Sequence, residues 1–298
     1  MNLRYQITEL DSYSEMDIQY STMLDGCYHV YLDIGSNLGV QVRKLFEPSK
    51  YPEAKMNPVF DAIFGTEKVR TQNKHGDNHY LCVVGFEPNS QLSNYLKQVE
   101  TSYTQCGWRV TFLTETAVSD KYGSTEFYTD GEQNKYEWGG GILPNSVIRV
   151  AKDNTTKYNN YSRVKLIRLS DFLRHVVGKR KLPTFDFENT SQKAPTVVMK
   201  LDIEGSEVDV IPDLLFSGGL EYVNLMMIEW HAFLQQKQGR KNATKILRSI
   251  LKSMEVYSKL MLNDPLENQD VDYVKHNFRI LNVDDETYGM TKFDLPVC

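Results

Sequence analysis

The segment that most constrains the fold runs from Val30 to Gly39 and reads VYLDIGSNLG. A strand-forming apolar run ends in Asp33, and two glycines follow with the spacing DxGxxxG. Gly35 permits a sharp turn with positive φ, and Gly39 lets the following helix pack close to a ligand. The segment therefore predicts a buried strand, a tight turn and a helix that together open the backbone for a cofactor.

The same segment discriminates between two classes of cofactor. The dinucleotide fingerprint GxGxxG needs a second glycine two residues after the first, and this chain has Asn37 there. The carboxylate of Asp33 suits a cation, because it can accept hydrogen bonds from an ammonium group such as that of S-adenosylmethionine. The pattern favours S-adenosylmethionine over NAD, although DxG at a strand end also occurs in ordinary turns.

The rest of the chain alternates short apolar runs with helical patterns, which predicts an α/β fold with a mostly parallel, doubly wound, Rossmann-like sheet. The expected strands lie near residues 28 to 34, 80 to 86, 109 to 114, 196 to 203 and 223 to 229. Two late runs, near residues 278 to 283 and 288 to 293, are expected to close the sheet as a hairpin. The clearest helix spans residues 240 to 257, where one apolar stripe faces the core.

A length of 298 residues with 41% hydrophobic content suits one domain, so we expect a single unit over residues 1 to 298. Residues 1 to 26 are interpreted as an N-terminal extension and residues 40 to 79 as an insertion after the first strand. Connections of that length are often lids or contact surfaces. A second irregular stretch covers residues 130 to 162, and its triple glycine is typical of a lid hinge or a mobile loop.

The charge balance constrains the partners. A formal net charge of -5 and a sequence pI near 5.8 give no electrostatic footprint for nucleic acid or for an anionic membrane. We therefore expect a small-molecule or glycan partner, no nucleic acid and no membrane. The oligomeric state is not predicted.

The cysteines and the N-terminus favour a cytoplasmic chain. The four cysteines, Cys27, Cys82, Cys106 and Cys298, lack CxxC spacing, so reduced structural thiols and no zinc site are expected. The first residues lack the apolar core of a signal peptide, and no stretch reaches membrane-spanning length. Four N-glycosylation patterns begin at Asn154, Asn160, Asn189 and Asn242, and we attribute them to chance.

Two further strands end in residues suited to a nucleoside. The second strand ends in VGFEPN, where Glu87 is a candidate clamp for two ribose hydroxyls or the start of a Glu-Pro turn. The third leads into TAVSDKYG, whose small residues leave room for an adenine ring. The same stretch is also a sound turn without any ligand.

Charged residues gather at the ends of the fourth and fifth strands. Lys200, Asp202 and Glu204 share one face of the fourth strand, and buried charges of this kind need a ligand, a counter-ion or solvent. Glu229 and His231 share a face of the fifth, and His231 suits a general base or a histidine bonded to a neighbouring acid. Glu207 and Asp209 are interpreted as acids that favour a helix N-terminus.

Four segments in order, YLDIGSNLG, VGFEPN, AVSD with Gly123, and KLDIEGSEVDVIPDLL, resemble the FkbM family of S-adenosylmethionine-dependent methyltransferases. The resemblance covers roughly residues 28 to 231 apart from the insertion, and residues 164 to 173 also look like a family segment. It implies a class I methyltransferase fold and O-methylation of a hydroxyl of a sugar, a glycan or another small natural product.

The resemblance and the strand-end pattern together give a set of site residues. The cofactor-binding candidates are Asp33, Gly35, Ser36, Asn37, Gly39, Glu87, Pro88, Ala117 and Asp202. The catalytic candidates are His231, Asp202 and Glu204, with His231 or else Asp202 as the base. The aromatic residues Tyr136, Trp138 and Trp230 are candidates for stacking on the acceptor.

Three alternatives stay open. Asp202, Glu204, Glu229 and His231 offer oxygen and imidazole ligands to a divalent ion such as Mg²⁺, although no dedicated metal motif is present. The chain is otherwise interpretable as a non-catalytic S-adenosylmethionine-binding subunit that presents its insertion to a partner. An NAD oxidoreductase is disfavoured by the glycine spacing.

Overall fold

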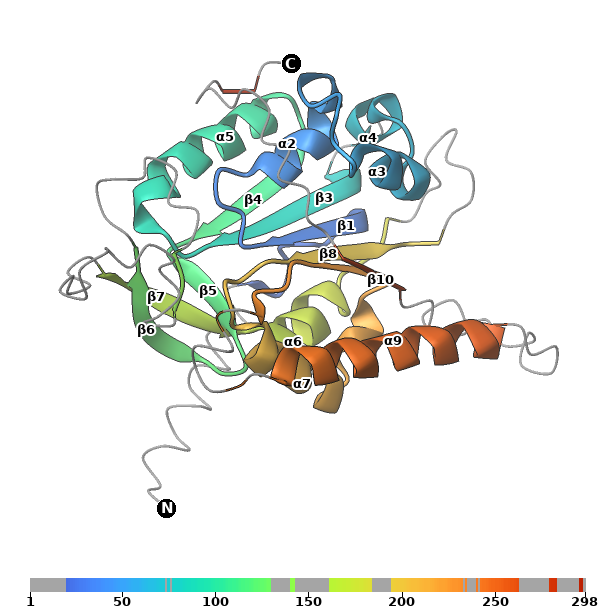
Figure 1. Cartoon of the computed structure of the whole chain (residues 1–298). Helices are drawn as coiled ribbons and strands as arrows, with labels where there is room; N and C mark the ends of the chain where they lie inside the picture. The colour runs from blue at the N-terminus through green and yellow to red at the C-terminus, as the bar shows by residue number, and fades with distance from the viewer. Residues whose placement is uncertain are drawn as a thin grey trace.

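The computed structural model describes residues 20–72, 74–75, 77–129, 140–142, 161–183, 194–232, 234, 240, 242–262, 279–282 and 295–296. In these residues a twisted central sheet lies between two layers of helices (Figure 1). The predicted α/β class with a mostly parallel, Rossmann-like sheet is confirmed.

In the described residues the central sheet has seven strands. They are β1 (Cys27–Ile34), β2 (Lys74–His75), β3 (Asn78–Glu87), β4 (Arg109–Thr114), β8 (Val197–Leu201), β9 (Leu225–Ile228) and β10 (Arg279–Asn282). The order is β10-β9-β8-β1-β3, with β4 parallel to the later part of β3 and the short β2 antiparallel to its start. All five strands expected from the apolar runs are therefore confirmed to within a few residues.

The first of the two late runs, near residues 278 to 283, is confirmed as a strand. It forms β10, which pairs in parallel with β9 and is the last strand of the sheet among the described residues. The run near residues 288 to 293 lies outside the described residues.

Helices cover both faces of the sheet (Figure 1). On one face lie α2 (Val40–Phe46), α3 (Asn57–Phe64), α4 (Glu67–Gln72) and α5 (Ser93–Gln105), with short 3₁₀ turns at Pro48–Lys50 and Ser90–Leu92. On the other lie α6 (Leu169–Phe172), the π-helical turn Leu173–Val177, α7 (Glu207–Phe216), the 3₁₀ turn Gly219–Tyr222 and α9 (Ala243–Leu262). The helix expected at residues 240 to 257 corresponds to α9.

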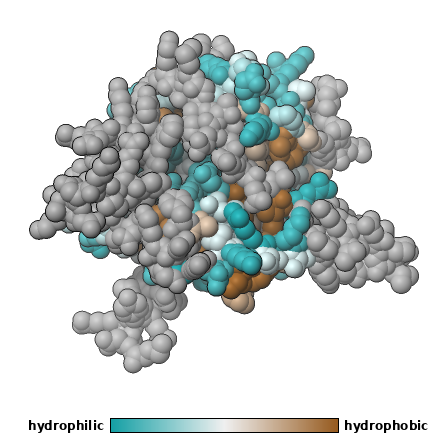
Figure 2. Space-filling model, viewed as in Figure 1, coloured by the Kyte–Doolittle hydropathy of each residue, from teal (hydrophilic) through white to brown (hydrophobic). Residues whose placement is uncertain are grey.

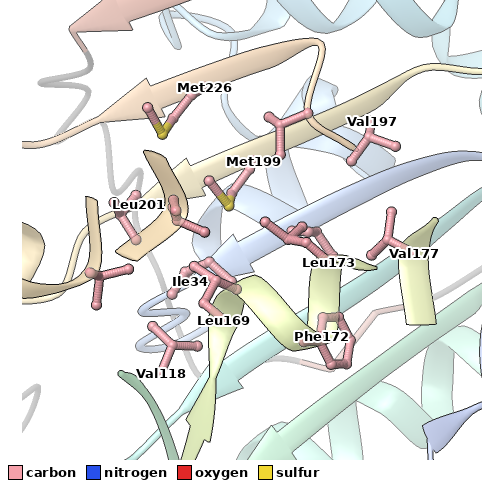
Figure 3. Close-up of a cluster of buried hydrophobic side chains, with 14 of the residues drawn as sticks. Ile34, Val118, Leu169, Phe172, Leu173, Val177, Val197, Met199, Leu201 and Met226 are labelled. Carbon is pink, nitrogen blue, oxygen red and sulfur yellow. The ribbon is translucent and has the colours of Figure 1, made fainter. Parts of the chain in front are cut away.

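The core around the central sheet has two parts, because side chains of β1 alternate between the two faces of the sheet. Ile34 packs in the cluster on the α6 and α7 side, which Figure 3 shows together with Phe172 and Met199. Tyr31 packs on the opposite side, against Phe60 of α3. Each such side chain contributes roughly 1.5–3 kcal/mol when it is fully buried.

The described residues of the long connection between β1 and β3 belong to the packed core and do not form a lid. Phe60 and Phe64 of α3 are fully buried. The guanidinium of Arg70 in α4 is also buried, and it donates to the main-chain oxygen of Leu45 at 2.9 Å and pairs with Asp61 at 2.5 Å. These contacts fix α3 and α4 against the sheet.

A second, three-stranded sheet was not predicted. It consists of β5 (Thr116–Ser119), β6 (Gly123–Tyr128) and β7 (Tyr161–Arg168) in the order β5-β7-β6. The main chain of Gly141 pairs with that of Tyr128 in both directions, at 2.9 and 3.1 Å. Gly141, from the stretch interpreted as irregular, therefore lies beside β6 of this sheet.

The prediction of reduced thiols is wrong for the described cysteines. Cys27 in β1 and Cys82 in β3 form a disulfide with a Cα–Cα distance of 5.7 Å, and both residues are fully buried. Cys106, at the end of α5, is also disulfide-bonded. The spacing along the sequence did not reveal the bond, because β1 and β3 become neighbours only in the folded sheet.

The described surface is mixed in polarity. Figure 2 shows hydrophilic side chains over much of the coloured surface, with hydrophobic side chains in separate patches between them. Among the described helices, none has the length and apolar character needed to cross a membrane.

Candidate functional site

The candidate site lies where the parallel strands end. The strand registers place Asp33 of β1 level with Gly85 of β3 and with Lys200 of β8, so these strands end at one edge of the sheet. Ligands of open α/β sheets bind at this edge. A cavity with about 620 Å³ of empty space, part of it open to solvent, lies there. Its lining residues are Ile34, Gly35, Asn37, Phe86, Glu87, Pro88, Thr116, Ala117, Val118, Phe127, Gly140, Gly141, Ile142, Asp202, Ile203, Glu204 and Ser206.

The turn after β1 forms one wall of the cavity. The main-chain N–H groups of Gly35 and Ser36 donate to the oxygen of Phe86 at 3.1 and 2.9 Å, while Asp202 N–H donates to Ile34 at 3.1 Å. A Cβ atom on Gly35 would lie 1.9 Å from the main-chain oxygen of Asp202. Gly35, with φ of +83°, is therefore required both by its conformation and by the close approach of the β8 end.

Glu87 at the end of β3 is tied to the same turn. Its Oε2 accepts from Asn37 N–H at 2.6 Å, and its Oε1 accepts from Asn89 N–H at 2.8 Å. Burial raises the pKa of Glu87 to about 7, although both hydrogen bonds favour the ionised form. Asn37 has a left-handed backbone with φ of +49°, a conformation that is uncommon outside glycine.

A buried lysine links the acids of β1 and β8. Lys200 Nζ lies 2.8 Å from Asp202 Oδ2, 2.9 Å from the main-chain oxygen of Gly35 and 4.0 Å from Asp33 Oδ1. Asp33 is fully buried, and burial raises its pKa to about 6 despite the nearby ammonium. Asp33, Lys200 and Asp202 thus form one charged cluster beneath and beside the cavity.

His231, just after β9, is surrounded by acids. Its Nδ1 lies 2.8 Å from Oε1 of Glu207, while its Nε2 lies 3.4 Å from Glu204, 3.7 Å from Asp202 and 3.8 Å from Glu229. Burial opposes the charged imidazolium, yet the hydrogen bond and charge of Glu207 and the charges of Glu204 and Asp202 raise the pKa of His231 to about 10. The imidazole is therefore protonated at neutral pH.

Glu204 places a carboxyl group on the cavity wall. Its backbone has φ of +51°, and Oε2 is buried without a hydrogen-bond partner in the described structure. Burial raises the pKa of Glu204 to about 8, against the lowering effect of His231. A carboxyl group with a pKa near neutrality suits proton transfer.

The structure brings most of the predicted site residues to the cavity. Gly35, Asn37, Glu87, Pro88, Ala117, Asp202 and Glu204 line it. Asp33, Ser36, Gly39 and His231 do not line it.

The predicted residues that do not line the cavity lie behind its wall. Ser36 Oγ donates to the main-chain oxygen of Asp33 at 2.9 Å, so it supports the turn. Gly39 allows close packing, because a Cβ there would lie 3.1 Å from the ring of Phe112. Trp230 packs on the core and under the guanidinium of Arg248, and it does not line the cavity. Tyr136 and Trp138 lie outside the described residues.

Sequence reasoning missed three contributions to the site. It interpreted Glu207 only as a helix-start residue, whereas its buried carboxylate contacts His231. It noted Lys200 as a buried charge that needs a partner but did not pair it with Asp202, whose Oδ2 lies 2.8 Å from Lys200 Nζ. It also missed the wall formed by Phe127 and residues 140–142. The sequence contained one usable sign, because Glu207 and His231 each follow the end of a predicted strand.

One group of side chains in the described ranges has the geometry to hold a metal ion. Ligand atoms of Asp202, Glu229 and His231 all lie within 4.8 Å of one another. Carboxylate oxygens with an imidazole nitrogen suit a divalent ion such as Mg²⁺ or Mn²⁺.

The cavity residues also fit S-adenosylmethionine. Asn37 Oδ1 and Ser206 Oγ are buried around the cavity and have no hydrogen-bond partner in the described part of the chain. Buried polar atoms of this kind are normally satisfied, so they point to a polar ligand. Ala117 lines the cavity, and its small side chain leaves room for a flat ring.

Comparison with known proteins gives one match. The chain matches the family model described as the methyltransferase FkbM domain over residues 33–257. No curated protein and no solved structure matches the chain.

Proposed function

The chain belongs to the FkbM methyltransferase family, and we propose that it transfers the methyl group of S-adenosylmethionine to a hydroxyl of a sugar, a glycan or another small natural product. The observation that carries the proposal is the cavity at the strand ends, where Gly35, Asn37 and Glu87 meet Asp202 and Glu204. One side of the cavity offers the turn and the acid that suit a nucleoside, and the other offers acids that suit proton transfer.

Several residues of the chain would hold the cofactor. The carboxylate of Glu87 is positioned to accept ribose hydroxyls, and Ala117 forms a small-residue wall for the adenine. The carboxylate of Asp202, which lines the cavity, would face the methionine part and balance its ammonium group. Lys200, which lies between Asp202 and the buried Asp33, would hold Asp202 in place. S-adenosylmethionine, when bound, supplies an electrophilic methyl group.

The remaining chemistry is orientation of the acceptor and removal of one proton. We assign proton removal to Glu204, because its buried Oε2 lies at the cavity wall without a hydrogen-bond partner in the described structure. Its ion pair with His231 Nε2 is long, at 3.4 Å, compared with 2.8 Å between Lys200 and Asp202. Asp202 is paired with Lys200, and His231 is protonated at neutral pH and lies behind the wall. The structure therefore favours Glu204 over His231 and Asp202 as the base.

His231 would then assist through its charge. Glu207 fixes the imidazole through Nδ1, so Nε2 faces the carboxylates of Glu204 and Asp202. A protonated Nε2 offsets their mutual repulsion and favours the ionised form of Glu204.

A metal-assisted form of the same reaction is the second candidate. The 4.8 Å grouping of Asp202, Glu229 and His231 favours it, since a divalent ion there would lower the pKa of an acceptor hydroxyl. Activity that persists unchanged after chelation and dialysis would exclude this form, and restoration by Mg²⁺ or Mn²⁺ would support it.

The experiment uses the purified full chain with deuterated S-adenosylmethionine and a panel of methyl glycosides, glycans, phenols and hydroxy acids. Mass spectrometry of the acceptors is expected to find one added deuterated methyl group on a hydroxyl. Glu204→Gln should lower turnover by about 10²-fold or more while leaving cofactor affinity nearly unchanged. The matched control is Glu67→Gln, at an exposed position of α4 away from the cavity, and it should not lower turnover.

The same experiment tests the rival interpretation. Binding of S-adenosylmethionine without any methylated product across the panel would favour a non-catalytic cofactor-binding subunit. Equal turnover in Glu204→Gln and the unmodified chain would refute Glu204 as the base.

A further inference from the structure

The disulfide between Cys27 and Cys82 lies in the centre of the fold. It joins β1 to β3, the neighbouring strands whose ends form the cavity, and both cysteines are fully buried. Buried sulfurs are poorly accessible to an attacking thiolate, and exchange requires that access. The position therefore indicates a structural bond and not an exposed, exchanging one.

The bonding of the other described cysteine also indicates an oxidising environment. Cys106 is disulfide-bonded, and no cysteine in the described residues carries a free thiol. Disulfides persist in oxidising compartments and are rare in the cytosol, where thiols are kept reduced. The bonding of every described cysteine is therefore typical of a chain that folds in a secretory compartment.

An independent feature lies on the surface. Asn242-Ala243-Thr244 matches the acceptor pattern for N-linked glycans, and the side chain of Asn242 is exposed immediately before α9. The main-chain oxygen of Asn242 accepts from Ile246 N–H at 3.0 Å, so the first turn of α9 fixes the backbone and leaves the side chain outside. Asn242 does not line the cavity, so a glycan there would leave the site open.

We propose that this chain folds in an oxidising secretory compartment, where Cys27 and Cys82 form their disulfide and Asn242 carries an N-linked glycan. The proposal replaces the expectation of a cytoplasmic chain with reduced thiols. It does not depend on the proposed methyl transfer. The patterns at Asn154, Asn160 and Asn189 lie outside the described residues and are not part of it.

Both modifications balance chemically. The two thiols lose two protons and two electrons to a protein disulfide, which is reduced to a dithiol as the Cys27–Cys82 bond forms. At Asn242 a bond forms between Nδ2 and the anomeric carbon of an oligosaccharide, and the bond from that carbon to a lipid diphosphate breaks. The amide proton leaves to a base, and the lipid diphosphate leaves as the anion.

The test is peptide mapping of the endogenous protein, captured by antibody from the cells that make it. Free thiols are blocked at capture, and the chain is digested without reductant. We expect a linked peptide pair that contains Cys27 and Cys82 and separates on reduction. Peptides that contain Asn242 should gain the mass of deamidation after N-glycan release in ¹⁸O water.

The outcomes separate the two parts of the proposal. Blocked thiols on both Cys27 and Cys82 would overturn the oxidising compartment. The linked pair with an unmodified Asn242 would retain the compartment and refute the glycan site. An Asn242→Gln variant, expressed from the same gene in the same cells, should lose one glycan in gel mobility, and an unchanged mobility would also refute that site.

Discussion

The close approach of the β1 turn to the end of β8 gives a prediction with a matched control. In Gly35→Ala the new Cβ would lie 1.9 Å from the main-chain oxygen of Asp202, whereas an ordinary contact begins near 3.4 Å. The two strand ends must therefore separate by about 1.5 Å, and neither can give way easily because main-chain hydrogen bonds hold both.

The control is Gly218→Ala. Gly218 has φ of +75°, close to the +83° of Gly35, but a Cβ there would meet its nearest neighbour, Glu221, at 3.6 Å. Gly218→Ala should lower the free energy of unfolding by about 1 kcal/mol. The left-handed backbone disfavours alanine, and this loss is partly offset because alanine restricts the unfolded chain. Gly35→Ala adds an overpacking cost of roughly 1–3 kcal/mol, so we expect it to lower the free energy of unfolding by about 3 kcal/mol in all.

The assay is urea unfolding followed by circular dichroism, with calorimetric titration of S-adenosylmethionine on the folded variants. Gly35→Ala should also weaken the cofactor at least about tenfold, equivalent to about 1.4 kcal/mol, because the cavity wall moves. Gly218→Ala should leave the affinity unchanged. Equal losses of stability in the two variants, or an unchanged affinity in Gly35→Ala, would refute the reasoning.

Three further predictions concern the disulfide and the titrating groups. Replacing Cys27 and Cys82 together by Ala removes a cross-link between residues 55 positions apart in the sequence. Urea unfolding should show that the free energy of unfolding falls by about 4 kcal/mol. A fall of less than about 1 kcal/mol would contradict a structural bond. Glu207→Gln should lower the pKa of His231 from about 10 toward its ordinary value, as measured by NMR of the imidazole, and an unchanged pKa would contradict the pairing. The affinity for S-adenosylmethionine should rise about tenfold between pH 6 and pH 8, because Glu87, with its pKa raised to about 7, accepts ribose hydroxyls best when ionised. A calorimetric affinity that does not change with pH would count against that role.

The sequence predicted the central sheet well because buried parallel strands leave a strong local pattern. Each of the five runs is continuously apolar or β-branched, and each became a strand with nearly the expected bounds. The small sheet of β5, β6 and β7 was missed because its strands have a weaker pattern. In β6 most residues are exposed or half-buried, so the hydrophobic alternation is faint.

The site was predictable where it depends on strand ends and hidden where it depends on contacts across the fold. Gly35, Glu87 and Asp202 were predicted to lie together because each stands at the end of a recognisable strand, and all three line the cavity. The pairing of Glu207 with His231 joins residues 24 positions apart and needs the order of β8 and β9. The Cys27–Cys82 bond likewise needs the β1–β3 pairing, which no local pattern records.

The central claim is that the cavity at the ends of β1, β3 and β8 binds S-adenosylmethionine. Calorimetric titration of the folded, unmodified chain tests it most directly, with NAD titrated in parallel. The account predicts saturable binding of S-adenosylmethionine at one site per chain and no binding of NAD. A folded chain that binds NAD, or that binds no S-adenosylmethionine at pH 8, would contradict it.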